Sequence, residues 1–211
     1  MTILESPPTA PYAESSIPVL ETERLVLRAP RIEDVPAIAE LADNAAIAEM
    51  TVSLPHPYRA DDARAFVETL ALGANAATFA IFLKRPRAAG LFAGMASIAT
   101  RPGEALPELG YWIGEPLWSR GIATEAARAV IDYVFSETDM PSLAGAARVV
   151  NPASRRVLEK CGFQWTGVGL TRVRALGASV PVDRFQLDRR TWVSIRAWGS
   201  TALPHRRAAA V

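Results

Sequence analysis

Residues 108–126 of this 211-residue chain place a strand, a glycine-containing loop and a helix in immediate succession. Residues 108–113 have the composition of a half-buried strand, Gly121 and the small Ala123 follow, and a helical repeat of apolar side chains begins there. The first N–H groups of a helix have no partner within it, and the helix dipole adds partial positive charge. The segment is therefore a candidate anion site, to which Arg120 adds a charge-assisted donor. The alternative is an ordinary strand–turn–helix in which Gly121 serves only the turn.

The rest of the chain alternates between strand and helix periods. Strands are predicted at residues 24–28, 78–84, 91–100, 108–113, 143–150, 163–173 and 183–187. Helices are predicted at about 33–42, 60–72, 121–136 and 152–161, the last closed by Gly162, with a helical or irregular end at about 190–198. Breakers around the third strand favour an antiparallel meander. This order indicates one α/β domain over residues 21–198, between a flexible leader (1–20) and a flexible tail (199–211).

Composition excludes several classes of function. The 23 Lys and Arg residues nearly balance the 22 Asp and Glu residues, which argues against a nucleic-acid-binding surface. Cys161 is the single cysteine and only two histidines are present, so neither a disulfide framework nor a metal site is expected. Uncharged stretches such as residues 88–100 are too short to cross a membrane, and no signal peptide is evident. We expect a soluble, cytoplasmic protein with no membrane partner.

Two blocks of sequence resemble a known family. Residues 118–126, Trp-Ser-Arg-Gly-Ile-Ala-Thr-Glu-Ala, are similar to the acetyl-CoA pyrophosphate loop of the GNAT acetyltransferases, with Ser119 in place of the customary glycine. Residues 151–163, Asn-Pro-Ala-Ser-Arg-Arg-Val-Leu-Glu-Lys-Cys-Gly-Phe, resemble the second block of that family. The segments 21–28 and 54–58 fit the branch that contains the ribosomal-protein N-terminal acetyltransferases. The resemblance covers about residues 21–195.

This resemblance implies a fold and a cosubstrate. The fold would be a single GNAT-like domain whose central sheet is mixed, mostly antiparallel and seven-stranded, splayed between strands 4 and 5 and flanked by about four helices. Acetyl-CoA would lie in the splay, without a metal. The residues implied to hold it are Tyr111, Trp112 and Ile113 through their main chain, the loop residues Trp118, Ser119, Arg120, Gly121, Ile122, Ala123 and Thr124, and Asn151 and Ser154.

The resemblance also suggests catalytic roles. Glu108 is the candidate general base, because a partly apolar site beside Trp112 would raise its pKa; the alternative is a surface glutamate in an ion pair. Ser154 is a candidate donor of a proton to the leaving thiolate. Asn151 precedes a proline and fits a helix N-cap as well as a cofactor ligand, and the two roles can coexist. Cys161 is interpreted as a small buried hydrophobe rather than a nucleophile.

The acceptor is less constrained by the sequence. Walls of its pocket are expected from residues 44–58 and from a loop at 171–182, where Arg172 and Arg174 either bind an acidic group or are simply solvated. The predicted function is acetyl-CoA-dependent N-acetyl transfer to a primary amine, with a protein N-terminal α-amine as one candidate acceptor. The alternatives are a small-molecule amine acetyltransferase and a non-catalytic acetyl-CoA sensor. A monomer or a homodimer is compatible with the sequence.

Overall fold

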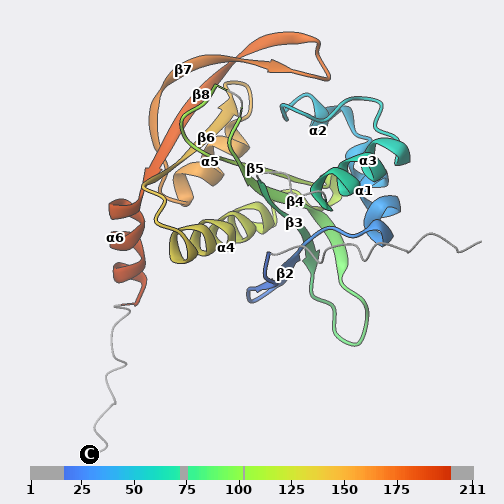
Figure 1. Ribbon diagram of the computed structural model, residues 1–211, viewed down its shortest axis with the longest axis horizontal. Helices are drawn as coiled ribbons and strands as arrows, with labels where there is room; N and C mark the ends of the chain where they lie inside the picture. Colours follow the sequence, from blue (N-terminus) through green and yellow to red (C-terminus); the bar gives the residue numbers. More distant parts are fainter. Residues whose placement is uncertain (1–16, 72–75, 102, 201–211) are drawn as a thin grey trace, which may run out of the picture.

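The computed structural model describes residues 17–71, 76–101 and 103–200, and its strands form one sheet (Figure 1). The strands are β1 (Leu20–Glu21), β2 (Leu25–Arg28), β3 (Ala76–Leu83), β4 (Leu91–Ala99), β5 (Glu108–Ile113), β6 (Ser142–Arg148), β7 (Gln164–Val173) and β8 (Ala178–Asp188). Their order in the sheet is β1-β2-β3-β4-β5-β6-β8-β7. Every neighbouring pair is antiparallel except β5 and β6. The mixed, mostly antiparallel α/β architecture is thereby confirmed.

Helices cover both faces of the sheet (Figure 1). They are α1 (Val35–Ala42), α2 (Ala45–Ala48), α3 (Ala60–Ala71), α4 (Ile122–Glu137), α5 (Pro152–Lys160) and α6 (Arg189–Ser200). One core joins α4 and α5 to the face that carries Leu27 and Leu109, and the other joins α1 and α3 to the face that carries Phe92 and Met95. Within the described residues, no helix has both the length and the apolar character needed to span a membrane.

The sheet opens between β5 and β6. Glu108 pairs with Ala144 and Leu109 with Gly145, and the register between the two strands ends there. Each strand keeps its outer neighbour, since β5 pairs with β4 as far as Ile113 and β6 pairs with β8 as far as Arg148. From Gly110 onward, the edges of β5 and β6 that face each other are therefore available to a ligand. This is the splay predicted between the fourth and fifth strands of the sequence analysis.

Two details differ from the sequence-based expectation. The described residues hold eight strands rather than seven, because Leu20 and Glu21 pair with Leu27 and Val26 in a two-residue strand too short to show a pattern. They hold six α-helices rather than about four, since the four-residue α2 escapes periodicity and the C-terminal segment is fully helical. Of the predicted leader and tail, residues 1–16 and 201–211 lie outside the described residues.

The predicted loop at residues 171–182 is instead the end of a long hairpin. β7 continues to Val173, β8 starts at Ala178, and Thr171 pairs with Val180. Gly177 adopts a φ of 62°, which lets the chain turn tightly between the two strands. The β-branched residues on both sides of this turn favour extended backbone, so pairing continues to the tip.

Candidate active site

The 118–124 loop joins β5 to α4 through two residues with left-handed backbone. Ser119 has a φ of 62° and Gly121 a φ of 75°, on either side of Arg120. The first helical hydrogen bond runs from the Glu125 N–H to the Gly121 carbonyl over 3.1 Å. The N–H groups of residues 122–124 therefore have no acceptor within the helix. Alternating backbone of this kind gathers successive N–H groups in a concave, anion-binding arrangement.

Trp118 fixes the other end of this loop. Its indole N–H donates to the Ile113 carbonyl oxygen over 2.6 Å, which ties the loop to the last residue of β5. Trp118 is 43% exposed and also lines the cleft, so it lies at the solvent edge of the site. Because this bond occupies the Ile113 carbonyl, the free main-chain groups along the splay are those nearer Tyr111.

Helix α5 forms the opposite wall of the splay. Asn151 caps it, because its Oδ1 accepts a hydrogen bond from the Ser154 N–H over 3.0 Å. The Ser154 hydroxyl lies 3.0 Å from the Tyr111 hydroxyl, which also donates to the Ser154 carbonyl oxygen over 3.1 Å. Burial raises the pKa of Tyr111 far above its ordinary value, so this phenol stays protonated. β5 and α5 are thus joined by side chains at the place where β5 and β6 have separated.

These segments enclose one cleft of about 580 Å³. All twelve residues implied as cofactor ligands line it: Tyr111, Trp112, Ile113, Trp118, Ser119, Arg120, Gly121, Ile122, Ala123, Thr124, Asn151 and Ser154. Its volume is in the range of pockets that hold a small cofactor. The combination of orphan N–H groups, open strand edges and this volume fits an elongated ligand with phosphate at one end.

The cleft also has walls that the sequence reasoning did not assign to it. They are Ala46, Ile47, Met50 and Thr51 around α2, Leu117, Val150, and the α5 residues Ala153, Arg156, Val157 and Lys160. The first four lie in segment 44–58, which was expected to line an acceptor pocket. The α5 residues recur at helical spacing on the side of the helix that carries Ala153, so the 3.6-residue period is the signal that could have identified them.

Glu108 lies outside this cleft, at the closed end of the splay. Its carboxylate is 15% exposed and forms a close ion pair with Arg101. Glu104 and Arg184 form a second ion pair nearby, at 3.2 Å. Burial raises the pKa of Glu108 above its ordinary value, and the charge of Arg101 opposes that shift. Glu108 does not line the cleft, so its role as the general base stays a prediction.

Neither Cys161 nor His56 lines the cleft. Cys161 is buried at the end of α5, and burial raises the pKa of its thiol to about 11. A thiol in this state is a poor nucleophile, which fits a packing role. His56, in the segment expected to wall the acceptor pocket, lies with its Nδ1 3.3 Å from a carboxylate oxygen of Asp43.

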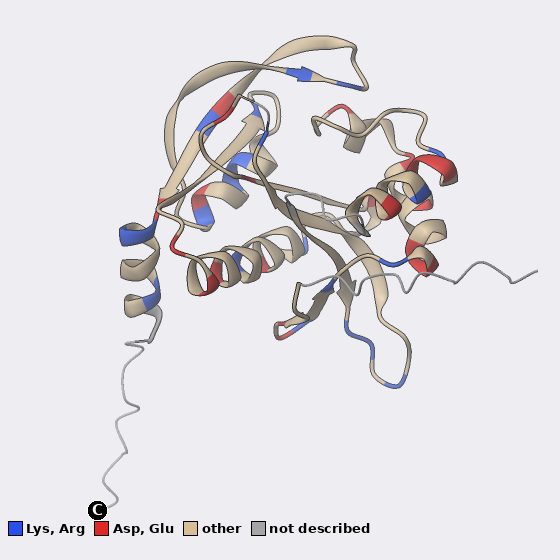
Figure 2. Cartoon of the chain, viewed as in Figure 1, with Lys and Arg blue, Asp and Glu red and all other residues tan. Residues whose placement is uncertain are grey.

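Charge is unevenly distributed over the elements around the cleft, and the segment that carries α1 to α3 is mostly acidic (Figure 2). Arg120, Arg156 and Lys160 line the cleft near the start of α4 and along α5. Residues 29–71, which contain α1 to α3, carry eight Asp or Glu against three Arg, a net charge of −5 in a chain whose net charge is +1. The cationic wall favours a phosphorylated ligand, and the acidic side favours a cationic one.

A mixed sheet that opens between two strands, with a loop of free N–H groups at the opening, is the arrangement that the sequence resemblance implied for an acetyltransferase. Known structures agree with this assignment at the level of the fold. RimL, a ribosomal L7/L12 alpha-N-protein acetyltransferase solved with coenzyme A, has a TM-score of 0.68 at 22% identity, covering 81% of this chain and 98% of its own. Spermidine N-acetyltransferase from Vibrio cholerae, solved with CoA and spermine, has a TM-score of 0.67 at 18% identity, covering 82% and 99%.

Sequence comparison identifies the family. Residues 24–164 match the model of the acetyltransferase (GNAT) domain. An uncharacterised N-acetyltransferase, p20, of Bacillus licheniformis is 27% identical over 175 residues, which cover 82% of this chain and 97% of the relative. The chain therefore belongs to the GNAT family and is a GNAT-type N-acetyltransferase, as the two sequence blocks indicated.

Proposed function

We propose that the protein transfers the acetyl group of acetyl-CoA to a primary amine of a cationic acceptor, with a protein N-terminal α-amine as the leading acceptor. The observation that carries this proposal is the cleft itself, which brings the 118–124 loop, the open edge of β5 and the cap of α5 to one ligand-sized space. GNAT folds act with acetyl-CoA, and CoA is bound in the relatives described above.

The loop residues would hold the diphosphate of the cosubstrate. Main-chain N–H groups of residues 119–124 supply donors, and Arg120, Arg156 and Lys160 supply charge. The pantetheine arm would then run along the open main chain of β5 toward Gly110. This direction brings the thioester to the region where Tyr111 and Ser154 meet and where β5 and β6 begin to pair.

The reaction needs a neutral amine, a stabilised oxyanion and a proton for the departing thiolate. Glu108, at the closed end of the splay, would accept the amine proton, directly or through water. The Tyr111–Ser154 pair would return a proton to the thiolate, because both hydroxyls stay protonated at neutral pH. The sequence suggested Ser154 alone for this step; the contact with Tyr111 adds a second hydroxyl.

The acidic character of residues 29–71 supports a cationic acceptor. A peptide N-terminus and a polyamine both carry positive charge at neutral pH, and a net charge of −5 around α1 to α3 would concentrate them on that side. A polyamine remains the alternative acceptor, because the same acidic segment would also attract it. An acidic acceptor bound by Arg172 and Arg174 receives no such support.

Free thiol released from acetyl-CoA tests this proposal. The protein would be assayed with peptides that present different free N-termini, with the same peptides blocked by N-acetylation, and with spermidine. We expect thiol release with free N-termini and none with the blocked ones. Release with spermidine alone would assign the alternative acceptor, and tight CoA binding without release for any amine would favour the sensor function.

A further inference from the structure

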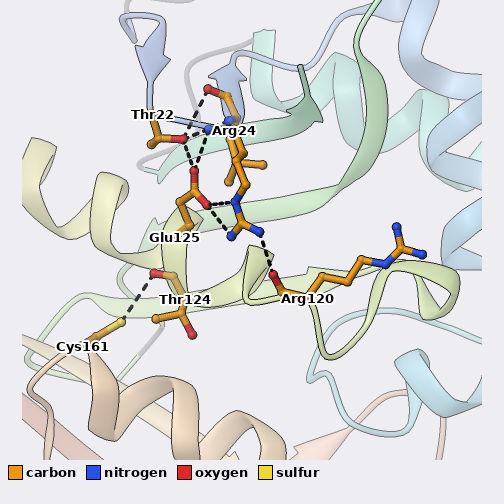
Figure 3. A network of polar contacts seen from close by, with 7 residues as sticks. Thr22, Arg24, Arg120, Thr124, Glu125 and Cys161 are labelled. Carbon is orange, nitrogen blue, oxygen red and sulfur yellow. Dashed lines mark hydrogen bonds and ion pairs between the residues drawn. The ribbon is translucent and has the colours of Figure 1, made fainter. Parts of the chain in front are cut away.

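We propose that Arg24 and Glu125 are positioning residues for the 118–124 loop, which they hold with the Gly121 N–H directed at the ligand. Arg24 precedes β2 and Glu125 lies in the first turn of α4, so 101 residues separate them in the chain. Figure 3 shows the Arg24 guanidinium between the Glu125 carboxylate and the Arg120 carbonyl. The inference rests on the proposed function, because that function assigns phosphate to this loop.

The contacts between these residues are short and directional. Arg24 donates from Nε to Glu125 Oε2 over 2.7 Å, and its Nη2 lies 2.6 Å from the same oxygen. The backbone N–H of Arg24 donates to Glu125 Oε1 over 3.0 Å, and the Thr22 hydroxyl donates to it over 2.5 Å. An isolated surface ion pair contributes little, but this carboxylate is held from three directions.

The remaining donor of the guanidinium reaches the loop. Arg24 Nη1 donates to the Arg120 carbonyl oxygen over 2.9 Å. In a planar trans peptide, a carbonyl and the N–H that follows it point in opposite directions. Because the Arg120 carbonyl is held toward Arg24, the Gly121 N–H points away from Arg24. Gly121 lies between the cleft, which Arg120 also lines, and a second hollow that Arg24 lines, so an N–H that points away from Arg24 points to the cleft side.

Glycine at position 121 is part of the same arrangement. Its φ of 75° is in the left-handed region, and a Cβ there would lie 3.5 Å from Arg24 Nη2, an ordinary contact. Backbone conformation rather than space therefore selects glycine. The Arg120 side chain extends away from the network (Figure 3), so the residue contributes its carbonyl to Arg24 and leaves its guanidinium free for the cleft.

The charge state of the pair is stable near neutral pH. Burial alone would raise the pKa of the Glu125 carboxyl, but hydrogen bonds from Thr22 and from Arg24 outweigh burial and lower it below its ordinary value. Glu125 is therefore ionised at neutral pH. Its negative charge also balances Arg24, so the effect of the pair on phosphate is geometric more than electrostatic.

The test compares ligands with and without phosphate. Calorimetry would give the Kd of CoA and of pantetheine for the wild type and for Arg24→Met, and kinetics would give KM and kcat for acetyl-CoA. We expect the Kd of CoA and the KM to rise about 10-fold, the scale of one charge-assisted hydrogen bond. The Kd of pantetheine should not change, and kcat should stay within about twofold. A purely structural role would affect both ligands alike.

Three further variants sharpen the result. Lys84→Met is the matched control, because Lys84 binds Glu21 and the Thr22 carbonyl in the same turn without contacting the loop, and it should bind CoA normally. Glu125→Gln keeps the side-chain shape and should weaken CoA binding less than Arg24→Met. Arg24→Lys keeps the charge but lacks the forked donors, so it should stay impaired.

The outcomes separate this inference from the proposed function. Wild-type protein that binds CoA no more tightly than pantetheine would overturn the phosphate cradle and with it both proposals. Tight CoA binding by the wild type together with equal binding by Arg24→Met would overturn the role of Arg24 alone. Full recovery of the wild-type Kd in Arg24→Lys would likewise refute positioning by geometry.

Discussion

The hydroxyl of Tyr111 on β5 lies 3.0 Å from the hydroxyl of Ser154 on α5 and bridges the two walls of the cleft. The residues are 43 positions apart in the chain, and their contact occurs where the adjacent strands have lost their own pairing. A side-chain pair thus takes the place of sheet hydrogen bonds at the splay. It also puts two hydroxyl protons beside the proposed path of the thioester.

Tyr111→Phe should lower kcat about 10- to 100-fold, because it removes a proposed proton donor while it keeps the aromatic ring in place. The KM for acetyl-CoA should change little. Steady-state kinetics measure both constants. Tyr133→Phe is the control, since Tyr133 packs edge-on against Phe79 in the core and does not line the cleft. Equal losses in the two variants would exclude a specific role for the Tyr111 hydroxyl.

Glu108→Gln should remove the acid limb of the pH–rate profile and lower the plateau about 100-fold or more. Burial raises the pKa of Glu108 above 4.5, so the carboxyl holds its proton to higher pH in the folded protein than in the unfolded chain. Its contribution to stability is therefore full below about 4.5 and is lost as pH rises through the raised pKa, while base catalysis appears over that same interval.

Glu104→Gln is the comparison for Glu108, because Glu104 belongs to the same charged cluster and pairs with Arg184 instead. Its pH–rate profile should match that of the wild type. A wild-type profile in Glu108→Gln would show that another group, or water alone, accepts the amine proton.

Arg156→Gln should raise the KM for acetyl-CoA about 3- to 10-fold, because it removes a cation that lines the cleft beside the proposed phosphate site. Arg155→Gln is the matched control: its guanidinium binds Glu159 at 2.9 Å and Asp183 at 3.4 Å and does not line the cleft. The difference between the two variants should shrink at high salt, which screens exposed charges. Equal KM values for both would refute a ligand role for Arg156.

Ser119→Gly should raise the stability of the protein by about 0.5–1 kcal/mol, equivalent to roughly 2 °C in Tm for a chain of this size. Ser119 has a φ of 62°, a conformation that costs a residue with a Cβ but not a glycine. The larger conformational freedom of glycine in the unfolded chain offsets part of the gain. Thermal melts of the wild type, Ser119→Gly and Ser119→Ala measure this effect, and only the glycine variant should melt higher.

The sequence best predicted the features that a short motif specifies. The two blocks at 118–126 and 151–163 identified the family, and residues from both blocks line one cleft. Gly162 has the φ of 91° that its position after α5 requires, and Asn151 is the N-cap that its place before a proline indicated. Such features depend on neighbours within one turn of chain, so a local pattern is enough to predict them.

Other features of the site depend on contacts between distant segments. The basic residues Arg156 and Lys160 join the cleft because α5 presents that side to the loop, and α2 joins it although four residues are too few for a periodic pattern. The hairpin at residues 171–182 was read as a loop, because pairing across the turn rather than propensity alone extends β7 and β8.

By itself, the sequence determined the order of the longer helices and strands, the strand–loop–helix at 108–126 and membership of the GNAT family, because each depends on short-range spacing and residue type. Only the tertiary structure decided where the sheet opens, that Tyr111 meets Ser154, and that Arg24 reaches the Arg120 carbonyl from 96 residues away. The physical reason is that the orientation of one peptide group depends on a side chain brought to it by packing. No local pattern specifies which distant arginine that will be.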